Sequence, residues 1–432
     1  MDVIIAVMSG KKLLAGAVVV MLGLGAAGFG AYRLLAPKPA SPFVRFDLEI
    51  YDAIQKNYWD KISDSDLSDL FQLGAEKLLD HPVTLATSTR AGVASLISDS
   101  TTSMTDAQKK DFVTQLGNLV LVNLKPFGRS ALYTENQTVA LRQTVANVDT
   151  SKNLYATVGA AAASTTAEIK TAAERQIALL SKNNSPAAAQ KIAAVKYAEQ
   201  VLANAADKSR YDQGGVEPTV FTREISPRIF YLRISKFAPT TLDEFVQAVQ
   251  KENGATAQNS LILDLRGNIG GAVDYLPYLF GLFMGPNQYI YDLYQHGDYV
   301  PIRTKIGKLP ELAKYQKNVV LIDNGTQSTA EDTAAVLKRF NLAVAVGTTT
   351  RGWGTIENTY PIDAPIDPSQ KYSALIVNSV TLRDDGLPIE GRGIDPTFPI
   401  SDKNWPVKFD NYFNYPELTA ATEKIIAAPP LR

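Results

Sequence analysis

The chain has 432 residues, of which 45% are hydrophobic and 20% are charged, with 43 basic and 44 acidic side chains. This balance is typical of folded domains and excludes disordered and collagen-like chains. A net charge of −1 leaves no basic excess to neutralise phosphates, so we expect no nucleic-acid partner. Cysteine is absent, and the histidines are His81 and His296. Disulfides, thiolate metal sites, cysteine nucleophiles and a three-histidine zinc centre are therefore excluded, and we expect neither a metal nor a cofactor.

An uncharged apolar run occupies residues 13–32, with Lys11 and Lys12 before it and Arg33 after it. At about 1.5 Å per residue it spans roughly 30 Å, the thickness of a bilayer core. We therefore expect a single-pass membrane protein with a transmembrane anchor over 13–35 and an extracytoplasmic body, either periplasmic or at the cell surface. A cleaved signal peptide is the alternative, although the run is long for one. The basic residues at its two ends nearly balance, so they do not decide the orientation.

Residues 42–150 are predicted to form an N-terminal helical region. Apolar residues recur there at helical spacing in two stripes, Phe46, Ile50, Ile54 and Tyr58, then Leu67, Leu70, Phe71 and Leu78. We interpret these stripes as the core faces of two amphipathic helices. The Ser63-Asp64-Ser65-Asp66 cluster between them can cap the second helix. Residues 84–150 continue with mixed helical patterning, and no chemistry can be inferred from them.

Residues 152–214 predict a separate helical unit, with a helix ending at Leu180, a polar loop and a second helix. The unit resembles a degenerate J-domain, the co-chaperone module. The matching positions are Leu154, Tyr155, Gly159, Ala163, Glu168, Ile169, Lys170, Ala172, Ala198, Val201, Leu202, Tyr211 and Asp212. The loop that carries His-Pro-Asp in that family reads Ser181-Lys182-Asn183-Asn184, so an Hsp70 partner is not expected. The alternative, to which we give equal weight, is an alanine-rich helical hairpin that acts as a spacer.

From residue 216 to 432 the pattern changes to strands that alternate with helices. Nearly continuous apolar runs at 229–234, 260–266, 319–323 and 342–346 predict strands covered on both faces. Helical stripes at 242–249, 273–284 and 329–340 supply the crossovers that parallel strands need. We therefore predict an α/β fold with a parallel sheet.

Two strand-to-helix junctions could carry chemistry, because α/β folds bind ligands at the carboxyl ends of parallel strands. The first, DLRGNIGG, runs from Asp264 to Gly271, and its glycines can expose consecutive N–H groups to an anion. The second, DNGTQSTAED, places Ser328 at a helix entrance. Ser328 and Glu331 also satisfy a capping box, so the serine could simply cap the helix.

Taken in order, these motifs resemble those of the C-terminal processing (tail-specific) proteases, serine peptidase family S41. The resemblance rests on RIFYLRISKF, LILDLRGNIGG, VVLIDNGTQSTAEDTAAVLKRF and GLPIEGRGIDPTFPI, with the helices of residues 46–80. It implies a ClpP/crotonase-like α/β core and acyl-transfer chemistry. It also implies that Ser328 is the nucleophile and that the N–H groups of Gly271 and Thr329 are the oxyanion donors. Helix starts favour negative charge, which agrees with these roles.

The general base of that family is missing. Its lysine lies twenty-five residues after the nucleophile, where this chain has Trp353. An indole only donates hydrogen bonds, and Arg351 stays protonated, so neither can take a proton from serine. Lys338 lies about 15 Å along the helix from Ser328 and is too far away. Glu357 replaces a glutamine of the family and would be a poor substitute base, and His296 is more typical of a solvated surface residue.

The family's PDZ domain, which reads peptide termini, also has no counterpart here, and the J-like unit occupies its place. The sequence therefore supports two hypotheses. In the first, the chain is a membrane-anchored S41-type serine peptidase that cleaves or binds C-terminal segments of peptides and proteins. In the second, it is a pseudoprotease that binds or scaffolds peptides without turning them over. Oligomers are compatible with either hypothesis.

Overall fold

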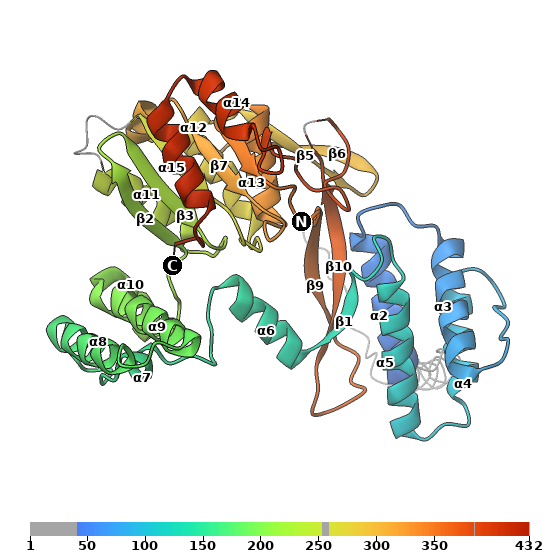
Figure 1. The fold of residues 1–432 in the computed structure, drawn as a ribbon. Helices are drawn as coiled ribbons and strands as arrows, with labels where there is room; N and C mark the ends of the chain where they lie inside the picture. The colour runs from blue at the N-terminus through green and yellow to red at the C-terminus, as the bar shows by residue number, and fades with distance from the viewer. Residues whose placement is uncertain (1–40, 253–258, 384, 432) are drawn as a thin grey trace, which may run out of the picture.

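The computed structural model describes residues 41–252, 259–383 and 385–431. Its centre is a six-stranded sheet in the order β11-β8-β7-β4-β3-β2 (Figure 1). Neighbouring strands from β11 to β3 are parallel, and β2 is antiparallel to β3. The strands are β2 Val220–Ser226, β3 Ile229–Ile234, β4 Ser260–Asp264, β7 Val319–Ile322, β8 Val344–Gly347 and β11 Phe398–Pro399. The predicted parallel sheet is confirmed.

Helices cover both faces of this sheet, which explains why its strands are apolar on both sides. On one face, alternate strand residues such as Phe230, Leu232 and Leu263 share a core with three crossover helices. On the other face, Tyr231 and Ile262 pack against two C-terminal helices. The elements of the first face are α11 Thr241–Lys251, η2 Val273–Tyr275, α12 Leu276–Met284, η3 Pro310–Lys314 and α13 Thr329–Arg339. Those of the second are α14 Trp405–Phe413 and α15 Pro416–Ile426.

A second, antiparallel sheet lies beside the first and was not predicted. Its longest strand, β10, pairs with β9 along one edge and with β1 and β5 along the other. The strands are β1 Ala131–Thr134, β5 Tyr289–Gln295, β6 Asp298–Arg303, β9 Thr355–Ile362 and β10 Tyr372–Thr381. Because β1 comes from the N-terminal region, residues far apart in the chain build this sheet together.

Four N-terminal helices share a core with this second sheet (Figure 1). They are α2 Pro42–Asn57, α3 Asp64–Leu79, α4 Arg90–Thr101 and α5 Asp106–Val122. Of these, α2 and α5 are the two that lie against the strands of the sheet. The two predicted amphipathic helices are confirmed as α2 and α3, and their apolar stripes share a core with Ile362 and Ile376. Ser63 caps α3 by accepting a hydrogen bond from Asp66 N–H at 3.0 Å. The predicted helical region therefore shares its core with the C-terminal part of the chain.

The segment between the two sheets forms the bridging helix α6 and a helical module (Figure 1). The module has its own core, which includes Leu154, Ile169 and Val201. Helices α8 and α9 form the predicted hairpin, and the J-domain resemblance stays a prediction. The bounds are α6 Glu135–Val145, α7 Leu154–Val158, α8 Thr166–Leu180, α9 Pro186–Ala203 and α10 Ala205–Gly214.

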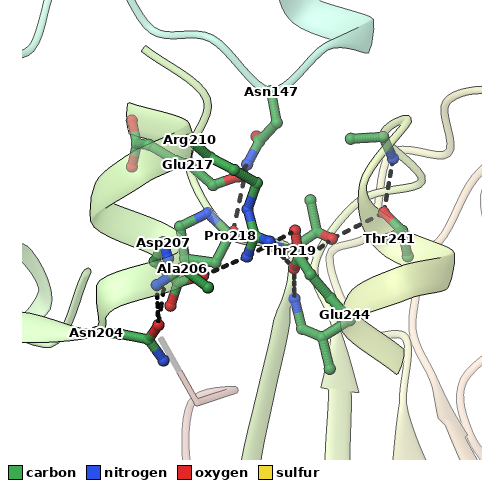
Figure 2. A network of polar contacts seen from close by, with 12 residues as sticks. Asn147, Asn204, Ala206, Asp207, Arg210, Glu217, Pro218, Thr219, Thr241 and Glu244 are labelled. Atoms are coloured by element: carbon green, nitrogen blue, oxygen red, sulfur yellow. Dashed lines mark hydrogen bonds and ion pairs between the residues drawn. The ribbon is translucent and has the colours of Figure 1, made fainter. Parts of the chain in front are cut away.

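Polar contacts join this module to the central sheet (Figure 2). Arg210 on α10 pairs with Asp207 and lies 3.7 Å from Glu244 on α11. Glu244 Oε2 accepts hydrogen bonds from the N–H groups of Thr219 at 2.6 Å and Val220 at 2.9 Å, at the start of β2. The module is therefore attached through buried charge as well as through the chain itself.

The predicted anchor over 13–35 lies outside the described residues. Within the part of the chain that the structure describes, no helix combines the length and apolar character needed to cross a bilayer.

Candidate active site

The two junctions singled out in the sequence lie side by side. Gln327 N–H donates a hydrogen bond to Asn268 O at 2.9 Å, and Thr329 Oγ1 donates one to Gly271 O at 2.8 Å. Both loops follow strands of the parallel sheet, β4 and β7, which are direct neighbours. The carboxyl ends of neighbouring parallel strands meet at one edge, so this proximity is a consequence of the topology.

The first loop is shaped by two glycines with positive φ angles, 85° at Gly270 and 141° at Gly271. A Cβ atom on Gly270 would lie 2.7 Å from Ser328 Cβ, and one on Gly271 would lie 2.0 Å from Phe237 O. Both positions therefore require glycine for space as well as for conformation. Asn268 holds the turn, since its side chain accepts a hydrogen bond from Gly270 N–H and donates one to Ile234 O.

Ser328 is the N-cap of α13, as the capping-box pattern predicts, but its backbone is unusual for a cap. Its φ and ψ angles are 55° and −131°. Ser63, an ordinary N-cap in the same chain, has −73° and 155°. Positive φ is a strained conformation for a residue with a side chain, and such strain clusters at active sites. Capping alone therefore does not account for the conformation of Ser328.

Two backbone N–H groups next to Ser328 indicate an anion site. Among the groups that the structure describes, the N–H groups of Gly271 and Thr329 have no hydrogen-bond partner. Thr329 is the first residue of α13, where the helix dipole adds positive potential. Unpaired donors of this kind can stabilise the oxyanion of an acyl-transfer reaction.

Glu331 ties the serine loop to the turn that contains Trp353. Its carboxylate is fully buried and accepts hydrogen bonds from Ser328 N–H at 2.9 Å and from the N–H groups of Gly352 and Trp353 at 2.7 Å each. Thr350 Oγ1 donates a fourth. Burial raises the pKa of Glu331, and these hydrogen bonds oppose that shift. One acidic side chain therefore sets the relative position of residues 328 and 353.

Trp353 is held on three sides. Its backbone N–H donates a hydrogen bond to Glu331, and its indole Nε1 donates one to Glu357 Oε1 at 3.1 Å. The Arg129 guanidinium lies 3.6 Å from the centre of its ring. Arg129 in turn pairs with Glu390 at 2.8 Å. The aromatic ring is therefore a built part of the site, positioned by cation–π contact and hydrogen bonding.

Glu357 is the carboxylate beside Trp353 that we consider as a substitute base. Its Oε1 accepts hydrogen bonds from Trp353 Nε1 and from Thr355 Oγ1 at 2.5 Å. Burial is the largest cause of a raised pKa at Glu357, and these two hydrogen bonds lower it in part. The raised pKa makes Glu357 a stronger base than an ordinary glutamate. Its Oε1, however, already accepts the hydrogen bonds from Trp353 and Thr355.

These residues line one groove of about 370 Å³. Its walls come from the loops after β3, β4 and β7, from strands β1, β9 and β10 of the second sheet and from α6. The N-terminal region therefore contributes directly to the site. The lining residues are Gly128, Arg129, Ala131, Tyr133, Leu141, Thr144, Val145, Lys236, Ile269, Gly270, Gly271, Val273, Gln327, Ser328, Thr329, Trp353, Thr355, Ile356, Glu357 and Leu375. A groove of this size can hold a short extended peptide segment.

Comparison with known proteins agrees with this arrangement. Residues 228–400, which contain both junctions and the Trp353 turn, match the sequence model of peptidase family S41. Residues 228–400 therefore carry the sequence pattern of peptidase family S41.

Two similar proteins carry the name CtpA or CtpA-like. The carboxy-terminal processing protease CtpA of Bacillus subtilis (strain 168) is 31% identical over 147 residues, which cover 34% of this chain and 30% of that protein. A probable CtpA-like serine protease of Staphylococcus aureus (strain N315) is 29% identical over 174 residues, 40% of this chain and 33% of that protein. The match thus spans about a third of the length of these relatives.

A solved structure extends the likeness of fold beyond the matched core. The photosystem II D1 C-terminal processing protease superimposes with a TM-score of 0.50 at 14% identity, covering 84% of this chain and 93% of that one. At this identity the comparison supports the S41 fold alone.

Three other residues considered from the sequence do not line the groove. Lys338 Nζ donates to Asp395 O at 2.8 Å, and His296 Nε2 contacts Lys56 O at 2.5 Å. Arg351 is exposed. Their positions agree with the predictions that none of the three serves Ser328 as a base.

Sequence reasoning missed Lys236, Arg129 and Glu331 as parts of this S41 site. A signal existed for Lys236, which is separated from the end of strand β3 by Ser235 alone and so lies at the same sheet edge as the two junctions. Glu331 was noted only as half of a capping box. No local signal identifies Arg129, because its place beside Trp353 depends on how the N-terminal region packs.

Proposed function

We propose that this S41 protein binds extended peptide segments, including the C-terminal segments of proteins, in the groove and forms an acyl-enzyme at Ser328. The observation that carries the proposal is a strained serine beside two unpaired N–H groups, all lining one groove. Strain and unpaired donors are both costly in a folded protein unless they serve a ligand.

In this proposal Ser328 Oγ attacks the carbonyl carbon of the scissile peptide bond. The carbonyl oxygen gains negative charge and is held by the N–H groups of Gly271 and Thr329. Collapse of the tetrahedral intermediate releases the amine and leaves an ester at Ser328, which water then hydrolyses. Edge strands β1 and β9, whose residues line the groove, are suited to align a substrate as an added strand.

The test is covalent labelling by a fluorophosphonate probe, which reports an activated serine and needs no known substrate. We expect the wild type to be labelled and Ser328→Ala to be unlabelled. Ser63→Ala is the matched control, because it also removes the hydroxyl of an N-cap serine, and it should be labelled like the wild type. Labelling of Ser328→Ala at the wild-type level, or no labelling of the wild type at any pH, would refute the proposal.

A second candidate function is that of a pseudoprotease, and the observation that favours it is the fixed position of Trp353. Arg129 and Glu357 hold the ring, and Glu331 holds the backbone N–H of the same residue, where the family resemblance expects a lysine. An indole cannot accept the serine proton, so this end of the groove offers an aromatic binding surface instead. This function predicts that fluorescent peptides bind to the wild type, that Trp353→Ala weakens their binding, and that no probe labels Ser328.

We also propose that residues 13–35 anchor the chain in a membrane with the body outside the cytoplasm. The support is the uncharged run of membrane-spanning length in the sequence. Extraction at alkaline pH should leave the full chain in the membrane pellet and release a variant that begins at residue 41. Release of the full chain would contradict the anchor.

A further inference from the structure

Lys236 lines the same groove as Ser328, which has no lysine at the position of the family's general base. It follows β3, the strand next to β4 in the parallel sheet. The neighbouring Phe237 N–H donates to Gly270 O at 2.9 Å, and Phe237 O closely approaches Gly271. Gly270 in turn packs against Ser328 Cβ. Lys236 is therefore the chain neighbour of a residue that is hydrogen-bonded to the turn of the proposed oxyanion donor Gly271.

The surroundings of this lysine differ from those of a surface lysine. Its Nζ donates to Thr144 O on α6 at 2.9 Å, and within the described ranges no carboxylate pairs with it at salt-bridge distance. The charged groups that act on it are Glu217, Asp149 and Lys152.

These surroundings make the charged form of Lys236 less favourable than it is for a solvated lysine. Burial lowers the pKa of Lys236 and is the largest influence. Lys152 lowers this pKa further, whereas Glu217 and Asp149 raise it. The neutral amine of lysine is the form that can accept a proton, and a lowered pKa brings that form closer to neutral pH.

We propose that Lys236 is the general base for Ser328 in this chain and replaces the lysine that the family carries at the position of Trp353. The proposal rests on the proposed acyl transfer at Ser328. Its Nζ would leave Thr144 O and turn toward Ser328 Oγ within the groove that both residues line. Other cationic candidates, Arg351 and Lys338, do not line that groove.

The proton path balances in both halves of the reaction. Neutral Nζ takes the proton of Ser328 Oγ as Oγ bonds to the carbonyl carbon and the carbonyl π electrons move to oxygen. The resulting ammonium gives that proton to the leaving nitrogen as the C–N bond breaks. In deacylation Nζ takes a proton from water as the water oxygen attacks the ester, and it returns a proton to Ser328 Oγ as the ester C–O bond breaks.

The experiment measures the rate of fluorophosphonate labelling against pH in the full chain. Lys236→Met and Lys236→Arg should each slow labelling by about 100-fold or more, because a general base contributes about 10²–10⁴-fold. The arginine variant keeps the charge and can still donate to Thr144 O, so slower labelling in this variant cannot be ascribed to loss of these contacts. Lys314→Arg is the matched control. Lys314 Nζ also donates to a backbone carbonyl and burial also lowers its pKa, but Lys314 lies outside the groove.

A second readout does not depend on activity. In protein whose lysines carry ¹³C-methyl groups, the NMR signal that is absent from Lys236→Arg should titrate below the usual lysine value of about 10.4. The wild-type labelling rate should rise with pH through the same midpoint.

The outcomes separate the two proposals. Labelling at Ser328 that keeps its rate and pH profile in both Lys236 variants overturns the base assignment and leaves the proposed function standing. The assignment is likewise overturned if Lys236→Met weakens only substrate binding, as a lysine that holds a substrate carboxylate would. Absence of Ser328-dependent labelling in the wild type overturns both proposals.

Discussion

The two ends of the groove are built in different ways. Beside Ser328, the proposed oxyanion donors are backbone N–H groups fixed by Gly270, Gly271 and the start of α13. The position that the family resemblance assigns to the base carries Trp353, whose ring is held by the side chains of Arg129 and Glu357. We call the N–H groups of Gly271 and Thr329, with the glycine turn that positions them, the backbone cradle. Its geometry depends on glycine conformation and on a helix terminus, which the topology sets. A base is one side chain, and a single substitution removes it or allows another to take its place.

Restoring the family pattern should produce the largest effect. Trp353→Lys with Glu357→Gln should raise peptide turnover, by up to about 100-fold if the new amine reaches Ser328. In this background Lys236→Met should no longer reduce the rate, because the second lysine makes the first dispensable. Turnover of a model peptide, with circular dichroism to confirm folding, measures both effects. A folded double variant that gains no activity would show that base loss does not limit this site.

The backbone cradle can be tested through its glycines. Gly271→Ala should lower the free energy of unfolding by about 4 kcal/mol or more, because its Cβ would lie 2.0 Å from Phe237 O. Gly267→Ala is the matched control, since Gly267 also has positive φ but has open space around it. Its cost should be about 1 kcal/mol, the conformational part alone. Urea denaturation measures the difference, and equal costs in the two variants would contradict the steric argument.

The interior behind the cradle should respond to pH through Asp332, in the first turn of α13. Burial is the largest cause that raises the pKa of Asp332 from 3.8 to about 7. A carboxyl group with a raised pKa stabilises the fold while it is protonated, so its contribution is lost as pH rises from about 4 through 7. The loss is at most about 4 kcal/mol at 1.36 kcal/mol per pKa unit.

Asp332→Asn should therefore reduce the fall in unfolding free energy between pH 4 and pH 8. Asp367→Asn is the control, because hydrogen bonds to Ser369 and the nearby Lys110 lower the pKa of Asp367 to about 2, below this range. An unchanged slope in Asp332→Asn would show that another group causes the pH dependence.

The strain at Ser328, the proposed nucleophile, should produce the smallest effect. Ser328→Gly should abolish labelling and yet stabilise the fold by about 1 kcal/mol, because relief of positive φ exceeds the entropic cost of glycine. Ser63→Gly, at an N-cap of negative φ, should instead cost a few tenths of a kcal/mol. Thermal denaturation compares the two variants. Destabilisation of Ser328→Gly by more than about 1 kcal/mol would remove strain as a feature that sets Ser328 apart from Ser63.

Much of the fold could be predicted from local pattern. Continuous apolar runs predicted the parallel strands, because strands covered by helices on both faces must be apolar on both faces. Helical stripes predicted α2, α3 and the α8–α9 hairpin. The antiparallel sheet was missed, since its strands β1 and β9 are only partly buried and their pairing with β10 joins distant parts of the chain.

The sequence by itself determined the chemistry that the ends of parallel strands can present: a serine at a helix start, a glycine turn next to it, and a tryptophan where the family resemblance expects a lysine. These depend on residue type and on spacing along one strand–helix unit. Only the tertiary structure decided that Arg129, α6 and Lys236 share the groove with Ser328. Their proximity comes from long-range packing between sheets, and a linear pattern does not encode which distant side chains such packing brings together.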